Sequence, residues 1–167
     1  MSLPDLPTIS AIIAALTGSV GLIDRVTDTY LKFRGTQTGV PKEHRAKIVA
    51  GSDGTSLVRL EHGREVERVT YEELTRKLNS GDLSYVRALE SSMNTHKQIW
   101  ESALPSLASE INPVAKAKLQ VQLDAIAGDM EKDLLQILDF VTRTGLHLDD
   151  HYASVRHIAA QKRQQGV

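Results

Sequence analysis

The chain contains no cysteine in its 167 residues. Disulfide bonds, cysteine-ligated zinc, iron–sulfur clusters and thiol catalysis are therefore excluded. Aromatic residues make up only 4% of the chain, so a hydrophobic core has to be built mainly from leucine, isoleucine, valine and alanine. Cores of that kind favour the packing of helices against helices. A chain of this length is sufficient for one domain with a core of its own.

The chain also lacks an excess of either charge sign. It has 20 Lys and Arg against 21 Asp and Glu, for a net charge of −1. Proteins that bind nucleic acid use clustered Lys and Arg to neutralise phosphates. The sequence has no such cluster, and we do not expect a nucleic-acid partner. No Lys or Arg precedes the N-terminal apolar run, so we expect no secretory signal peptide and a cytoplasmic location.

Long apolar runs are scarce as well. The uncharged stretch over residues 6–23 is diluted by threonine, serine and glycine. A membrane-spanning helix needs about 20 predominantly apolar residues, and this stretch is marginal by that standard. We therefore expect a helix that is buried in a bundle. The alternative is a membrane-directed effector whose apolar N-terminal helix inserts into a bilayer on release.

The clearest pattern that is present runs from Asn112 to Gly145. Asn112 is a good N-cap, and Pro113 suits the first helical position. Gly145 suits the left-handed residue that often ends a helix. Apolar residues recur between them every three or four positions, as in an amphipathic helix: Leu119, Leu123, Ile126, Met130, Leu134, Ile137 and Val141. The pattern predicts a helix of about 32 residues, roughly 48 Å long.

Further elements are predicted on both sides of this helix. Helices are expected over residues 8–34, 70–80 and 149–164, and Thr70 with Glu73 forms a capping box at the start of the second of these. Short apolar runs separated by glycine-containing turns predict a three-stranded antiparallel β-meander over residues 45–69. Residues 82–144 are predicted to form a hairpin of two long helices.

These elements predict a single domain over residues 1–167 of the mainly α (α+β) class. Its architecture is an antiparallel helical bundle built on the long helical hairpin, with the small meander inserted after the first helix. Because the first hairpin helix is expected to end near Pro105, the second should project beyond it by roughly 15 Å. The acidic residues Asp129, Glu131 and Asp133 are expected mostly on the solvent face of that second helix.

Two features suggest surfaces for contact with another protein. Ala11, Ala15 and Gly18 form a face of small residues on the first helix. A glycine inside a helix costs about 1 kcal/mol relative to alanine, so either a second helix approaches closely here or the helix is broken near Gly18 and Gly21. Trp100 is the largest apolar side chain of the hairpin and a contact for another subunit if it is exposed.

The most reactive-looking cluster lies near the C-terminus. His147, Asp150 and His151 are spaced so that they could ligate a divalent ion such as zinc or manganese, with His157 as a further ligand. A simpler interpretation is that Asp149 and Asp150 stabilise the first turn of the last helix, with both histidines on the surface. We favour this interpretation and expect no cofactor. His96, on an apolar helix face, is expected to be a hydrogen-bonded seam residue rather than a base.

Signatures of enzyme function are missing from the sequence. It has no phosphate-binding loop, dinucleotide fingerprint, zinc-protease helix or nucleophile elbow. We therefore expect a non-enzymatic helical protein-interaction module that self-associates into a homo-oligomer. The alternatives are the membrane-directed effector that uses residues 6–23 and a metal-dependent enzyme that uses the 147–151 cluster.

Overall fold

The computed structural model describes residues 6–35 and 40–165 of the chain. In order, these form α1 (Leu6–Gly18), α2 (Val20–Phe33), a short 3-10 helix η1 (Lys42–His44), β1 (Lys47–Ala50), β2 (Leu57–Glu61), β3 (Arg64–Val69), α3 (Tyr71–Lys77), α4 (Asp82–Ser109), α5 (Pro113–Thr144) and α6 (Asp150–Gln164). The predicted class, mainly α with a small antiparallel sheet, is confirmed.

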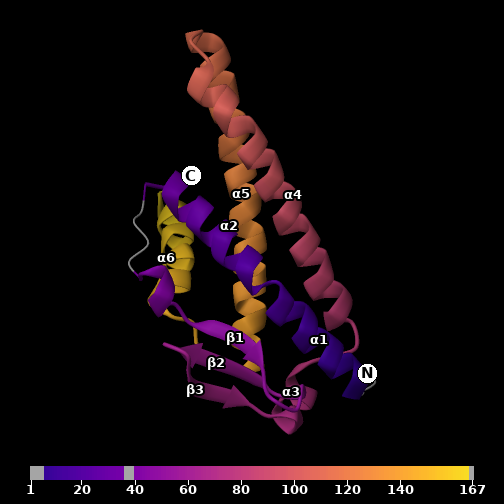
Figure 1. Cartoon of the computed structure of the whole chain (residues 1–167). Coiled ribbons are helices and arrows are strands. Elements are labelled where there is room, and N and C mark those ends of the chain that lie inside the picture. The colour runs from indigo at the N-terminus through magenta and orange to yellow at the C-terminus, as the bar shows by residue number, and fades with distance from the viewer. Residues whose placement is uncertain (1–5, 36–39, 166–167) are drawn as a thin grey trace.

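Helices α4 and α5 form the long hairpin that carries the other elements (Figure 1). The ends of α5 follow from local signals. The Asn112 side chain accepts hydrogen bonds from the backbone N–H groups of Val114 and Ala115, and Gly145 has a φ of 108°. A left-handed residue at this position ends the helix at low cost only when it is glycine.

Helix α4 is longer than the sequence predicted, because it continues through Pro105 to Ser109. Proline removes one backbone hydrogen bond and normally ends or kinks a helix. Here Leu107 still packs against the apolar core beyond the proline, and this burial favours continuation of the helix. Helices α4 and α5 have 28 and 32 residues, so the prediction that α5 projects well beyond α4 is wrong. Instead, the ends of both helices project together beyond the rest of the molecule (Figure 1).

The N-terminal helix is broken rather than continuous. α1 and α2 meet at Ser19 with an angle of 41° between them. A Cβ atom added to Gly18 or Gly21 would have nothing within 4 Å, so no neighbouring helix requires these glycines. Among the described helices, none is by itself both long and apolar enough to cross a bilayer, whereas α1 and α2 taken together meet that test.

The meander lies at the end of the hairpin that is opposite to its tip (Figure 1). Its strands pair antiparallel in the order β1-β2-β3, with Val49 opposite Val58 and a bulge between Arg59 and Leu60. The predicted capping box of α3 is present, since Thr70 and Glu73 each accept from the other's backbone N–H.

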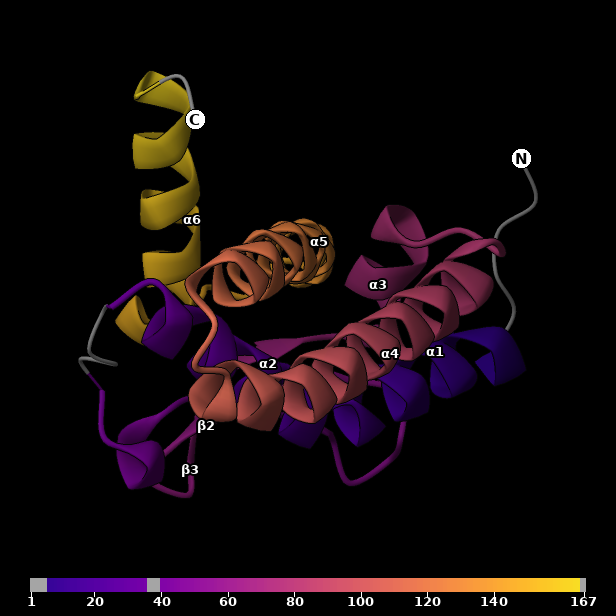
Figure 2. The ribbon, with the colours of Figure 1, turned by 90° about the horizontal axis from the view of Figure 1, so that it is seen from above.

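The core is formed where α1 and α2 cross the hairpin. Seen from above, α1 runs along α4, and α6 stands beside α5 (Figure 2). The core is chiefly aliphatic, and its largest fully buried side chains include Tyr30, Phe140, Ile9, Ile12, Leu16, Met93, Leu123 and Met130. The body of the molecule is therefore well packed, and the hairpin tip extends away from it.

Candidate functional site

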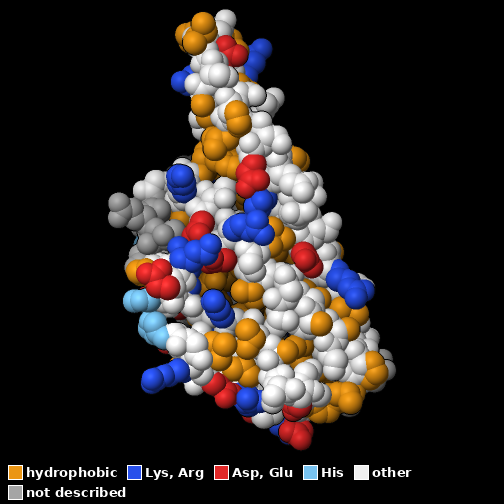
Figure 3. Space-filling model, in the orientation of Figure 1, with side chains coloured by type: hydrophobic (Ala, Val, Ile, Leu, Met, Phe, Trp, Pro, Cys, Tyr) orange, Lys and Arg blue, Asp and Glu red, His pale blue; other side chains and the backbone are white. Residues whose placement is uncertain are grey.

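The projecting part of the hairpin, residues 99–125, is named the arm. Large apolar side chains are exposed on it. In the described ranges eight large apolar side chains are exposed, and five of them lie on the arm: Ile99, Leu104, Ile111, Val114 and Val121. Apolar side chains are also visible on this part of the surface in Figure 3. A concentration of exposed apolar groups on one projecting element is typical of an interaction surface rather than of an ordinary solvated face.

The outer face of α5 is exposed along the arm. Val114 and Val121 have 66% and 67% of their surface exposed. They line an open groove of about 630 Å³ together with Pro113, Ala117, Lys118 and Gln122. On the opposite side of the same helix, Leu123 and Met130 are fully buried. The N-terminal half of α5 thus has two apolar stripes, one inside the hairpin and one exposed.

Trp100, predicted as a contact for another subunit if exposed, is only 5% exposed. Its ring packs edge-on against Phe33 of α2, with 4.6 Å between the ring centroids. This contact anchors the base of the arm to α2 because both rings are large and apolar. Trp100 is therefore a core residue.

The small-residue face of α1 is also remote from the exposed groove. Ala15 is partly buried and packs against the core, Ala11 is partly buried, and Gly18 is exposed at the end of α1. These three residues are therefore not part of the exposed apolar surface of the arm.

The residues predicted as metal ligands lie in different surroundings. The ring of exposed His147 is paired with Glu67 of β3, and Asp150 is exposed on α6. His151 is fully buried and faces α2. Across residues 6–35 and 40–165, no group of three His, Cys, Asp or Glu side chains is placed to hold a metal ion. The expectation that both histidines lie on the surface is wrong for His151, because α2 covers it.

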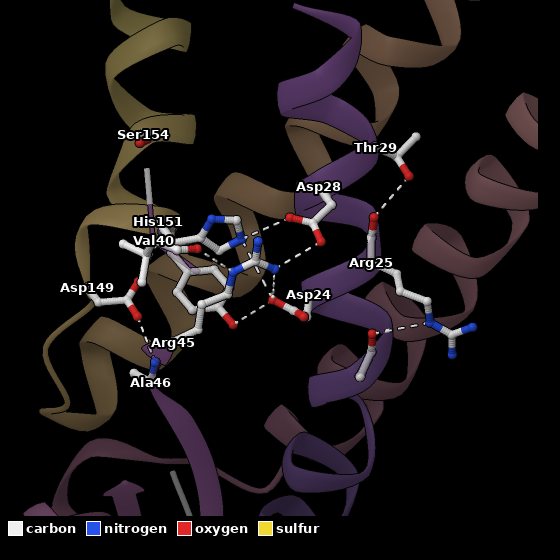
Figure 4. A network of polar contacts seen from close by, with 12 residues as sticks. Asp24, Arg25, Asp28, Thr29, Val40, Arg45, Ala46, Asp149, His151 and Ser154 are labelled. Atoms are coloured by element: carbon white, nitrogen blue, oxygen red, sulfur yellow. Dashed lines mark hydrogen bonds and ion pairs between the residues drawn. The ribbon is translucent and has the colours of Figure 1, made fainter. Parts of the chain in front are cut away.

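A polar cluster surrounds His151 and joins three segments of the chain (Figure 4). Nη1 of Arg45, just before β1, lies 3.0 Å from Oδ1 of Asp24 and 2.9 Å from Oδ2 of Asp28. Nε2 of His151 lies 3.3 Å from Oδ1 of Asp28. Asp149 caps α6 as predicted and accepts a 2.7 Å hydrogen bond from the N–H of Ala46.

The electrostatics of this cluster favour a neutral imidazole. Burial lowers the pKa of His151, the positive charge of Arg45 lowers it further, and the nearby carboxylates of Asp28, Asp24 and Asp149 only partly oppose this. Burial also raises the pKa of Tyr152, so its phenol keeps its proton. Because His151 has no exposed surface, it cannot touch a dissolved substrate. The cluster holds α2, the segment before β1 and α6 together.

A second polar contact crosses the hairpin seam. Oδ2 of Asp133 accepts from Ser92 Oγ at 2.8 Å and lies 2.7 Å from His96 Nδ1. His96 is thus a hydrogen-bonded seam residue, as predicted. Asp133 is buried and Glu131 is half-buried against Tyr30 and Lys162, so the expected solvent face for these two acids is wrong. The cause is that α4, α2 and α6 cover the flanks of α5.

No family model, curated protein or solved structure matches this chain. The geometry of the arm is therefore the basis for a functional assignment. The sequence contains a pattern that indicates the outer face of α5. Small apolar residues recur there at steps of three and four positions: Val114, Ala117, Val121 and Ala125. That stripe is weaker than the buried one, and only the structure identifies which of the two is covered.

Proposed function

We propose that this protein is a non-enzymatic helical interaction module that self-associates through its arm. The observation that carries the proposal is the gathering of five of the eight exposed large apolar side chains on that one projecting element. Removing such side chains from water is favourable by about 25 cal/mol per Å², and a monomer leaves all of them exposed.

A second copy of the same chain is the occupant that the charges favour. The outer face of α5 presents one basic and one acidic side chain, Lys118 and Asp124, both exposed. In a two-fold dimer the same patch is used by both copies, so it has to be complementary to itself. A face with both charge signs meets that condition, whereas a face of one sign would repel its copy.

The proposal is tested by sedimentation of the full chain over a concentration series. We expect a reversible increase toward twice the chain mass of 18.4 kDa. The triple variant Ile111→Ser/Val114→Ser/Val121→Ser should weaken association without loss of fold, because all three side chains are exposed. Val66→Ser, an equally simple change at an exposed valine of β3, is the matched control and should associate as the wild type does. A wild-type chain that stays monomeric at every concentration contradicts the proposal.

A further inference from the structure

The residues on the outer face of α5 are arranged almost symmetrically along the helix on the two sides of Val121. Three residues away on either side are Lys118 and Asp124, which carry opposite charges. Four residues away on either side are Ala117 and Ala125. In an α-helix, residues three and four positions from a central residue lie on the same face as that residue. All five side chains are exposed in the structure.

From this symmetry we propose that two copies pair antiparallel along α5, with the two-fold axis passing through Val121. The inference rests on the self-association proposed above and specifies its register. In this arrangement Val121 meets Val121 of the second copy, and Lys118 meets Asp124 of the second copy. The two-fold axis repeats the Lys118–Asp124 pair, so the interface contains it twice.

The side chains of this face suit a close helix pair. Alanine at positions 117 and 125 leaves room for two helix axes to approach to about 8–10 Å. The pairing extends seven residues on each side of the axis, where Val114 lies opposite Gly128 of the second copy. Such a contact covers about 21 Å of each helix, which corresponds to a small and reversible interface.

The pairing also accounts for a glycine that the single chain does not explain. Gly128 lies in the middle of α5, where glycine costs about 1 kcal/mol relative to alanine. A Cβ atom added to Gly128 would have nothing within 4 Å in the described chain, so no neighbour within the chain requires a glycine. In the antiparallel pair this position faces the branched side chain of Val114, and a residue without a side chain leaves room for it.

Charge reversal tests the register in the full chain. Lys118→Asp alone, or Asp124→Lys alone, places like charges opposite each other twice, and we expect each to weaken self-association about tenfold or more. An equimolar mixture of the two variants should associate again, because every contact in the mixed pair joins opposite charges. Lys116→Asp makes the same charge change two residues from Lys118, about half a helical turn away and therefore off this face, and it should associate as the wild type does.

The outcomes separate the two proposals. If the wild type associates and both charge variants associate equally well, the register is wrong while self-association stands. If the variants weaken but their mixture does not recover, the register is also wrong. A monomeric wild type removes both proposals.

Cross-linking gives an independent test, since the chain has no cysteine of its own. In Val121→Cys the two thiols would lie on the axis, with Cα atoms about 4–5.5 Å apart, within reach of a disulfide. Oxidised glutathione should convert the two thiols to one disulfide, with release of reduced glutathione, several-fold faster than in Gln120→Cys. Gln120 is also exposed and next to Val121, but one residue corresponds to a rotation of about 100° around the helix, so its side chain does not face the two-fold axis. Equal rates in the two variants would overturn the proposed axis.

Discussion

Nε2 of His151 lies 3.3 Å from Oδ1 of Asp28, and in the described part of the chain neither atom has a hydrogen-bond partner. The second carboxylate oxygen of Asp28 is bound by Arg45, so the carboxylate is already partly neutralised. A buried imidazole without hydrogen bonds is costly to charge, because burial and the Arg45 charge both oppose protonation. This pair is therefore a point at which the stability of the fold depends on pH.

The first prediction concerns acidification. The pKa of His151 in the folded chain is lowered from its ordinary value of 6.5. Between that value and the lowered pKa, the unfolded chain binds a proton that the folded chain does not. The free energy of unfolding should therefore fall as pH falls through this window, by up to about 1.4 kcal/mol per pH unit. Urea denaturation at about pH 7.5 and about pH 5.5 measures the difference.

A pair of histidine variants assigns this pH dependence to its source. In His151→Leu the difference in stability between the two pH values should shrink. His157→Leu is the control, because His157 is exposed on the same helix, and the difference should remain. If acidification stabilises the wild type, or if the His151→Leu profile is unchanged, His151 is not the group responsible.

The second prediction concerns the hairpin seam. Asp133→Ala removes the acceptor used by Ser92 and His96 between α4 and α5 and leaves their two side chains with only a 3.5 Å contact to each other. We expect the free energy of unfolding to fall by about 2 kcal/mol. Asp129→Ala is the matched control, since Asp129 is 61% exposed and 3.9 Å from His96, and it should cost less than about 0.5 kcal/mol. Equal losses of stability in the two variants would mean that the contact of Asp133 with Ser92 and His96 does not stabilise the fold.

The third prediction contrasts two glycines. Gly21→Ala should stabilise the chain by up to about 1 kcal/mol, because the added methyl group meets nothing within 4 Å and alanine favours the helix. Gly145→Ala should destabilise it by about 1 kcal/mol or more, because the residue has a φ of 108° and the added Cβ would lie 2.7 Å from Lys77 Nζ. Thermal unfolding of both variants checks the opposite signs, and a stabilising Gly145→Ala would contradict the C-cap geometry.

The fourth prediction uses Trp100, the single tryptophan of the chain. Its fluorescence should be shielded from acrylamide in the folded protein, because the side chain is buried against Phe33. Phe33→Ala should open this contact, increase quenching and lower the free energy of unfolding by about 3 kcal/mol. Shielding in the wild type should not change with protein concentration, because Trp100 lies off the outer face of α5. A concentration-dependent change would place Trp100 in the interface.

Much of the fold was predictable because its signals are local. The limits of α5 were predicted correctly from Asn112, Pro113 and Gly145, since capping and proline geometry act within a few residues. The capping box of Thr70 and Glu73 and the three short strands were predictable for the same reason. The break between α1 and α2 remained one of two alternatives, because a glycine pair is compatible with both a bend and a close approach.

The sequence by itself determined most of the secondary structure, the aliphatic core and the presence of a long hairpin, but not the end of α4 or the break between α1 and α2. Only the tertiary structure decided which polar and apolar residues are covered. Asp133 and His151 were expected on the surface, and Val114 and Val121 are not part of the apolar stripe that the sequence predicts for α5. The exposure differs from this expectation because burial depends on which elements pack against each face of a helix. Here α4 covers one face of α5, while α2 and α6 reach only its lower half and leave the outer face of its upper half free.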